Sequence, residues 1–231
     1  MEDLPANVTH YLIGIPVFLF LFFRSYKNYR RLHNPLSGYF ALTGLSAALA
    51  FAFWSLPLAF THDSTILEIS NAIGDLFLFG LYAISADLVH YLALRGRVSR
   101  RVFMTPVIIL CIIGWLSDVY GYFHYGIAVV NDQFTYKLPV LSSVTQIILL
   151  VGILLVGVLL LTKLSEQKTN RGKLGLAGVA VLYIISSLAG VLNVIPAESI
   201  NSPAIYGAYI IGFLIFVGMM IFARFKKTPT S

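Results

Sequence analysis

The sequence contains a single cysteine, Cys111, and few charged residues. One cysteine excludes a disulfide within the chain and a zinc site built on cysteine ligands. Charged residues make up 11% of the composition and hydrophobic residues 58%, which lies outside the range of ordinary soluble domains. These shortages leave no room for a soluble domain and point to a chain that lies in a membrane.

Lysine is missing from the apolar stretches. Every lysine, from Lys27 to Lys227, lies in a connecting segment, at a span end or in the tail. A retinal protein needs an intramembrane lysine for its Schiff base, so a retinal opsin is excluded and no cofactor is expected. None of the 5 histidines is paired with another at i+4 spacing, which argues against an intramembrane zinc hydrolase or a haem carrier. With no nucleophile motif either, we do not expect an enzyme.

Long apolar runs fill most of the chain. Seven of them are long enough to cross a bilayer as helices, and together they use nearly all of the 231 residues. The sequence therefore predicts an all-α integral membrane protein, a seven-transmembrane helix bundle that forms a single domain over residues 1–231. The predicted spans are 9–23, 36–60, 66–94, 102–122, 138–162, 174–195 and 204–222.

Basic residues gather in alternate connecting segments. They follow the first, third, fifth and seventh runs, whereas only Lys137 lies in a connection on the other side. Basic residues in short loops stay cytoplasmic, so we expect the N-terminus outside and the C-terminus in the cytoplasm of a multi-pass plasma (inner) membrane protein. This distribution also assigns the net charge of +6 to topology and to contact with anionic headgroups, and not to nucleic acid. The residues concerned are Arg24, Lys27, Arg30, Arg31, Arg95, Arg97, Arg100, Arg101, Lys163, Lys168, Arg171, Lys173, Arg224, Lys226 and Lys227.

The third run, 66–94, carries ionisable groups where the other runs carry almost none. It contains Asp75, Asp87 and His90, and such groups are costly in hydrocarbon unless they face the bundle interior, water or a partner. We therefore expect this helix at the centre of the bundle. The two aspartates are about 18 Å apart along the helix axis, too far to share a proton or a ligand directly.

Asn71, Asp75 and Tyr82 lie within about 40° of one another on a helix with 3.6 residues per turn. We interpret them as one wall of a ligand pocket in the outer half of the membrane. The alternative is a structural hydrogen bond from Asp75 to Asn71 or to a neighbouring helix. Weaker candidates for lining the same pocket are Gln146, Asn193, Tyr206 and Tyr209.

Asp87 and His90 form a second polar face nearer the cytoplasm, turned about 120° from the first. We interpret this face as a polar lock at the cytoplasmic end, with Arg95 or Arg97 as the partner of Asp87. The alternative is a station on a proton path.

Three histidines, His10, His62 and His124, share the expected outer edge with Asp63 and Asp118. Imidazoles and carboxylates at this edge could bind zinc or copper, or titrate as a pH sensor. The alternative is that they are ordinary interface residues spread around the bundle. The aromatic residues of 115–125, among which Asp118 lies, are expected at that interface as anchors.

The connections carry a resemblance to a known family. The segment RSYKNYRRLHNP, expected to be a basic inner loop, continues as LSGYF and is followed by the aromatic-ended ALTGLSAALAFAFW. A later connection, GIAVVNDQFTYKLP, favours a short hairpin. Together they resemble the seven-helix N-terminal sensor region of bacterial histidine kinases. The resemblance implies a seven-helix sensor, but no kinase or cyclase follows Phe225, so we expect output through a separate cytoplasmic signalling protein.

Three functions stay open at this point. The first is a membrane receptor or sensor that binds a small or lipophilic ligand, or protons, in an outer-half pocket near Asp75. The second is a transporter or channel-like protein in which Asp75 and Asp87 are successive stations. The third is a structural subunit of a membrane complex. The expected partners are the lipid bilayer and a cytoplasmic signalling protein, and a homo-oligomer is compatible with the sequence.

Overall fold

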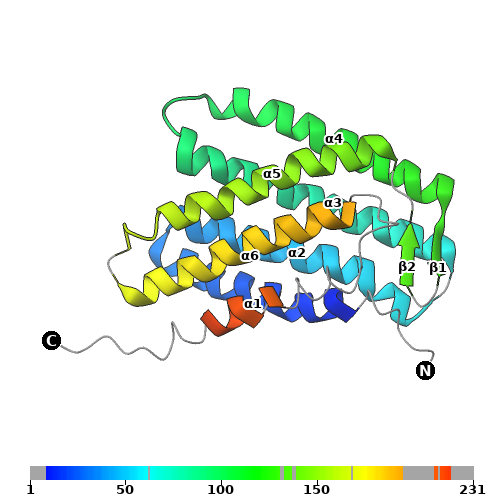
Figure 1. Cartoon of the computed structure of the whole chain (residues 1–231), viewed down its shortest axis with the longest axis horizontal. Helices are drawn as coiled ribbons and strands as arrows, with labels where there is room; N and C mark the ends of the chain where they lie inside the picture. The colour runs from blue at the N-terminus through cyan, green and yellow to red at the C-terminus, as the bar shows by residue number, and fades with distance from the viewer. Residues whose placement is uncertain are drawn as a thin grey trace.

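The computed structural model describes residues 9–61, 63–130, 133–136, 139–167, 169–194, 211–212 and 214–219. Helices make up nearly all of this part, joined by short turns and one β-hairpin (Figure 1). The long helices are α1 (Thr9–Leu32), α2 (Pro35–Ser55), α3 (Ser64–Val89), α4 (Arg100–Tyr125), α5 (Val140–Thr162) and α6 (Asn170–Val194). The shorter elements are the 3-10 turn η1 (Pro57–Ala59), the π-helical turn η2 (His90–Leu94), and the strands β1 (Ile127–Val130) and β2 (Gln133–Tyr136).

The described part contains 5 helices that are long and apolar enough to cross a membrane. They are α2 with η1, α3 with η2, α4, α5 and most of α6, and their mean hydropathy runs from 1.6 to 2.9. These helices correspond to the second to sixth predicted spans, so the predicted class of helical membrane protein is supported. The first predicted span lies in α1, which is not among the five. The seventh, 204–222, is described only at 211–212 and 214–219.

The helix α1 runs well past its apolar part, and here the sequence-based expectation is wrong. A basic loop was expected after residue 23, but the helix continues to Leu32 with Arg30 and Arg31 in its last turn. Arginine and lysine are good helix formers, so a helix need not end where hydropathy falls. Only two residues then separate α1 from α2: His33, with a left-handed φ of 49°, and Asn34, whose side chain caps α2.

The helix α3 lies at the centre of the described bundle. It packs against α2, α4 and α5, and its polar residues Asn71, Asp75 and Asp87 are all buried. The expectation that the third span is the hub, with its aspartates facing sister helices, is confirmed. α1 packs on the far side of α2, and α6 packs on α5 (Figure 1).

The helix α4 is the most peripheral of the five. Only 22% of its apolar window is buried, against 44% to 50% for the other four. Its outward face carries large exposed apolar side chains, including Ile108, Ile112, Leu116 and Phe123. Such a face suits contact with acyl chains.

The connections divide between the two ends of the bundle. The turns α1–α2, α3–α4 and α5–α6 lie at one end, which we call the turn end, whereas β1 and β2 lie at the other, the hairpin end (Figure 1). The two strands pair antiparallel, with Ile127 opposite Tyr136, so the predicted short hairpin is confirmed. The basic residues in the last turn of α1, in the α3–α4 turn and in the α5–α6 turn therefore share the turn end.

Candidate functional site

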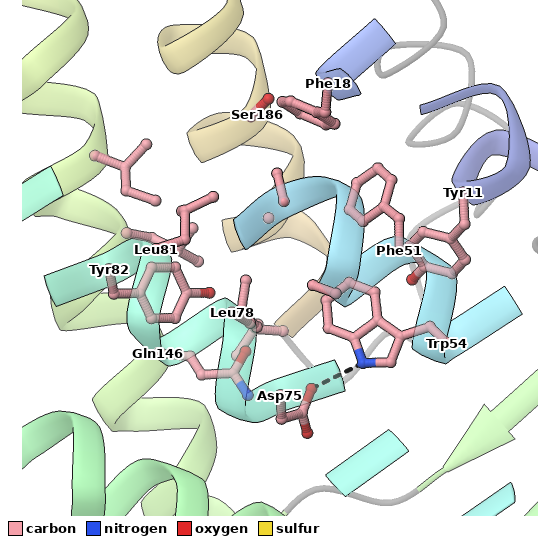
Figure 2. Close-up of a pocket in the computed structure, with 16 residues that line it drawn as sticks. Tyr11, Phe18, Phe51, Trp54, Asp75, Leu78, Leu81, Tyr82, Gln146 and Ser186 are labelled. Carbon is pink, nitrogen blue, oxygen red and sulfur yellow. Dashed lines mark hydrogen bonds between the residues drawn. The ribbon is translucent and has the colours of Figure 1, made fainter. Parts of the chain in front are cut away.

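Asp75 is held in a buried position between three helices. The residue is 3% exposed. Its Oδ1 accepts a hydrogen bond from Nε1 of Trp54 on α2 at 3.0 Å (Figure 2), and its Oδ2 accepts one from the hydroxyl of Tyr122 on α4 at 2.6 Å. Gly74 makes room for the indole, because a Cβ there would lie 2.5 Å from the Trp54 ring. Asp75 on α3 thus ties α2 and α4 together.

A second aspartate, Asp118 on α4, lies beside Asp75. Asp118 lies one helical turn before Tyr122, whose hydroxyl donates to Asp75, so both carboxyl groups lie at the same junction of α3 and α4, and we call the two residues the acid pair. Asp118 is fully buried, at 0% exposed. The helix α5 supplies its other partners, since Ser142 Oγ donates to Oδ1 and Gln146 Nε2 donates to Oδ2 at 3.0 Å. The cluster therefore connects α2, α3, α4 and α5.

The acid pair has a simple electrostatic consequence. A carboxyl group can donate a hydrogen bond to another carboxyl group only when it carries a proton. Two adjacent carboxylates in a buried site repel each other strongly if both are charged. The arrangement of Asp75 and Asp118 therefore suits one proton held between them, with the neighbouring donors stabilising the remaining negative charge.

A cavity of about 90 Å³ lies next to Asp75, between α1, α2, α3, α5 and α6. One wall is aromatic and consists of Tyr11, Phe18, Phe51 and Trp54 (Figure 2). These rings pack edge to face, with centroids 5.1 Å apart for Tyr11 and Phe51 and 5.3 Å apart for Phe18 and Phe51. The cavity thus combines an ordered aromatic wall with a carboxyl group at its edge, which is typical of small-molecule sites.

Two further polar groups face this cavity. Gln146 is 6% exposed and uses its amide nitrogen on Asp118 and Ser142. Its carbonyl oxygen accepts no hydrogen bond from the residues that the structure describes and points into the cavity (Figure 2). The side chain of Ser186 on α6 reaches the opposite wall. Gln146 and Ser186 therefore add polar atoms to the lining of a cavity that is otherwise mostly apolar.

The structure brings together three of the predicted pocket residues and separates a fourth. Asp75, Tyr82 and Gln146 all line the cavity. Asn71 is buried but lies outside the lining, and its amide donates to the Leu67 carbonyl of its own helix at 2.8 Å. The remaining candidates, the side chain of Asn193 together with Tyr206 and Tyr209, lie outside the described residues.

The expectation for the end of α4 is wrong for two residues. Asp118 and Tyr122 were placed among interface anchors, but they are 0% and 1% exposed and face α3. A signal for this inward face is present in the sequence. The buried residues of α4 recur at helical spacing and are small or polar, whereas the rest of the helix is mostly large and apolar: Cys111, Gly114, Asp118, Gly121 and Tyr122.

Asp87 forms the predicted lock, but with a different partner. Its two oxygens bind Nε and Nη2 of Arg100, both at 2.7 Å, and Tyr39 on α2 donates to the same carboxylate at 2.9 Å. Arg95 and Arg97 were the expected partners. Both lie beyond the end of α3 and are exposed, whereas the turn after them returns the chain so that the start of α4 lies beside Asp87.

His90 lies at the same end of α3 and contacts the α3–α4 turn. Its Nε2 lies 2.8 Å from the carbonyl oxygen of Val98 in the α3–α4 turn, and its ring packs near that of Phe103 at 5.7 Å. His90 therefore fastens the turn to the π-helical end of α3.

The predicted metal group is not assembled in the described part of the chain. His124 is exposed on α4, with its ring stacked on Tyr120 at 4.9 Å, whereas His62 and the side chain of His10 lie outside the described residues. Asp63 caps the start of α3, and Asp118 is buried in the acid pair. Among the described residues, no group of at least 3 histidine, cysteine or acidic side chains could hold a metal.

Comparisons of the chain with protein-family models, with curated proteins and with solved structures find no match. The fold and the site define a helical membrane protein with a buried acid pair at the edge of an aromatic cavity. Function must be argued from that site, because fold alone does not specify it.

Proposed function

We propose that this protein is a membrane sensor or receptor whose responsive element is α3. A small or lipophilic ligand, or a proton, acts at Asp75 and alters the contacts that α3 makes with its neighbours. The observation that carries this proposal is the position of Asp75. It borders the cavity and also bonds to α2 and α4, so occupancy or protonation must change contacts between helices.

The same helix supplies a route to the turn end. Asp87 follows Asp75 along α3 at a distance of about 18 Å, and there α3 is joined to α2 through Tyr39 and to α4 through Arg100. A helix is stiff over this length, so a shift at Asp75 is carried to the Asp87 contacts. A ligand drives such a shift only if it binds one arrangement better than the other.

The predicted topology has the turn end in the cytoplasm, since the basic residues at the end of α1 and in the turns after α3 and α5 gather there. A separate signalling protein would meet the bundle at this surface. The resemblance of the connections to histidine-kinase sensor regions supports the same assignment and a seventh span. The proposal therefore has the ligand acting in the outer half and the output leaving from the cytoplasmic turns.

Transport is the less favoured function, because the cavity does not join the two aspartates. Asp75 lines it, but Asp87 does not, and Asp87 is engaged by Arg100 and Tyr39. In sealed vesicles that contain the protein, we expect no proton or solute flux above protein-free vesicles. Flux that Asp75→Asn abolishes would replace the sensor proposal with a carrier.

A distance measurement at the turn end tests the sensor proposal. Spin labels are attached through Arg97→Cys and Ser165→Cys, two exposed positions in the α3–α4 and α5–α6 turns, in a Cys111→Ala background. Between about pH 5 and about pH 8 we expect the label separation to change by about 1–2 Å, as for helix shifts in other switching proteins. Asp75→Asn, which resembles the protonated carboxyl, should hold one distance at both pH values.

The matched control is Asp63→Asn, which changes an exposed carboxylate at the start of the same helix and keeps a capping side chain. This variant should respond to pH as the parent does. A label separation that stays constant in the parent protein at both pH values and with every lipophilic compound tested would contradict the sensor proposal.

A further inference from the structure

The polar groups that line the cavity beside Asp75 are mainly hydrogen-bond acceptors. Its described lining contains no lysine, arginine or histidine. The polar groups of its described lining include the Asp75 carboxyl, the carbonyl oxygen of Gln146, and the hydroxyls of Tyr82 and Ser186 (Figure 2). Carboxylate and carbonyl oxygens only accept hydrogen bonds, and hydroxyls can also accept them. A ligand that suits this lining brings donors, and it gains further if it is positively charged.

The aromatic wall points to the same ligand chemistry. Of the four rings, Trp54 lies next to Asp75, Tyr11 and Phe51 lie beside Trp54, and Phe18 lies at the far end near Ser186 (Figure 2). Faces of aromatic rings attract cations, most strongly when both are removed from water. The edges of the same rings and the neighbouring leucines suit an alkyl group. Carboxyl, amide oxygen and aromatic rings together are therefore complementary to an alkylammonium ion.

We infer that the ligand of this site is a small primary amine, bound as its ammonium ion beside Asp75 in exchange for the proton shared with Asp118. This inference rests on the proposed function and names the ligand class of the same site. No covalent bond changes: one ammonium ion enters, one proton leaves to solvent, and the charge of the site is unchanged. When the ammonium ion is bound, both carboxyl groups of the acid pair are ionised. This change would alter the contacts of α3 with α2 and α4.

The groups that face Asp75 determine which residue can release the exchanged proton. From α4 they are Asp118 and Tyr122, from α2 Trp54, and from α5 Gln146 through Asp118. Around the cavity, α3 adds Tyr82 and α1 adds Tyr11. Phenols titrate near pH 10, and tryptophan and glutamine do not titrate in this range, so the exchangeable proton belongs to the acid pair.

The volume limits the size of the ligand. A cavity of about 150 Å³ binds benzene, and this one measures about 90 Å³. It therefore suits an amine of about three or four heavy atoms. We choose propylammonium as the ligand to test and propan-1-ol as its uncharged counterpart of nearly the same shape.

Calorimetric titration of the full chain in lipid nanodiscs tests the inference. Near pH 7, propylammonium should bind at least about tenfold more tightly than propan-1-ol, as one charge-assisted contact provides. Titrations in two buffers of different ionisation enthalpy should show release of close to one proton. Equal affinity for the alcohol, or binding without proton release, would overturn the inference.

Three variants separate the roles in this exchange. Asp75→Asn should weaken propylammonium binding at least about tenfold. Asp118→Asn should keep binding within a few-fold of the parent while proton release falls toward zero, because a single carboxylate needs no shared proton. Asp63→Asn is the matched control, because it changes an exposed carboxylate at the start of the same helix, outside the lining, and it should leave affinity and proton release unchanged. Weakening by Asp63→Asn as large as that by Asp75→Asn would overturn the inference.

Binding to the parent protein and the pH response of the spin-labelled protein, which keeps both aspartates of the acid pair, together distinguish this inference from the proposed function. If neither compound binds but the labelled turn end still responds to pH, the amine is wrong and the sensor stands. If propylammonium binds with proton release but the turn end does not move, the ligand class is supported and the sensor proposal fails.

Discussion

Each oxygen of the acid pair has its own donor, and the four donors come from three helices, α2, α4 and α5. Trp54 and Tyr122 donate to Asp75, whereas Ser142 and Gln146 donate to Asp118. A buried acceptor that loses its partner pays the full cost of desolvation, which exceeds the net value of the hydrogen bond. Single-residue changes around this pair should therefore have effects out of proportion to the atoms removed.

Tyr122→Phe tests this at the level of one oxygen atom. The change removes the hydroxyl that donates to Asp75 Oδ2 at 2.6 Å and should lower the free energy of unfolding by about 1–2 kcal/mol. Denaturant or thermal unfolding in detergent measures it. Tyr120→Phe on the exposed face of the same helix should change stability by less than about 0.5 kcal/mol. Equal effects of the two changes would contradict the buried hydrogen bond.

At the scale of helices, close packing depends on small residues where two backbones meet. At Gly44 on α2, a Cβ would lie 2.7 Å from the Phe22 nitrogen and 2.8 Å from the Phe18 oxygen of α1. Backbone atoms cannot rotate away as a flexible side chain can. Membrane helices gain much of their association from such contact, because lipid supplies no hydrophobic drive between them.

Gly44→Ala should therefore force α1 and α2 apart and destabilise the protein by about 1–3 kcal/mol. The same unfolding measurement applies, with Gly80→Ala on α3 as the control. A Cβ at Gly80 meets nothing within 4 Å, and alanine is the better helix former, so this change should be neutral or stabilising. A Gly44→Ala protein as stable as the parent would show that the two helices can separate freely.

Sequence patterns predicted the helices α2 to α6 and the central place of α3. The bilayer requires long apolar runs and makes charges within them costly, so both features can be recognised in the sequence. They predicted Asp75, Tyr82 and Gln146 on one pocket, since helical spacing fixes which side chains share a face. They failed for Asp118, where the position near a span end suggested an anchor, and for Arg100, because ion-pair partners depend on where a turn brings the chain back. They also ended α1 too early, because hydropathy does not control helix hydrogen bonding.

At the scale of the whole molecule, the two ends of the bundle differ in charge. The turn end carries the basic residues at the end of α1 and in the turns after α3 and α5, and the hairpin end carries β1 and β2 (Figure 1). Short loops rich in lysine and arginine resist translocation. We therefore expect the turn end in the cytoplasm and the hairpin end outside.

Cysteine labelling with a membrane-impermeant maleimide tests this orientation. Cys111, the single native cysteine, is buried and is replaced by alanine. Phe60→Cys, at the exposed start of the connection to α3, should react in intact cells, whereas Ser165→Cys in the α5–α6 turn should react only after lysis. The reverse pattern would invert the topology and place the cavity in the inner half.

The peripheral position of α4 has one more consequence. This helix exposes most of its surface to the surrounding lipid, with only 22% of its apolar window buried, yet it carries Asp118 and Tyr122 on its inner side. A mismatch between such a helix and the thickness of the bilayer is accommodated in part by a change of helix tilt. A thinner or thicker membrane would tilt α4 against α3 and alter the distance between the two carboxyl groups. The thickness of the bilayer would then affect the site directly.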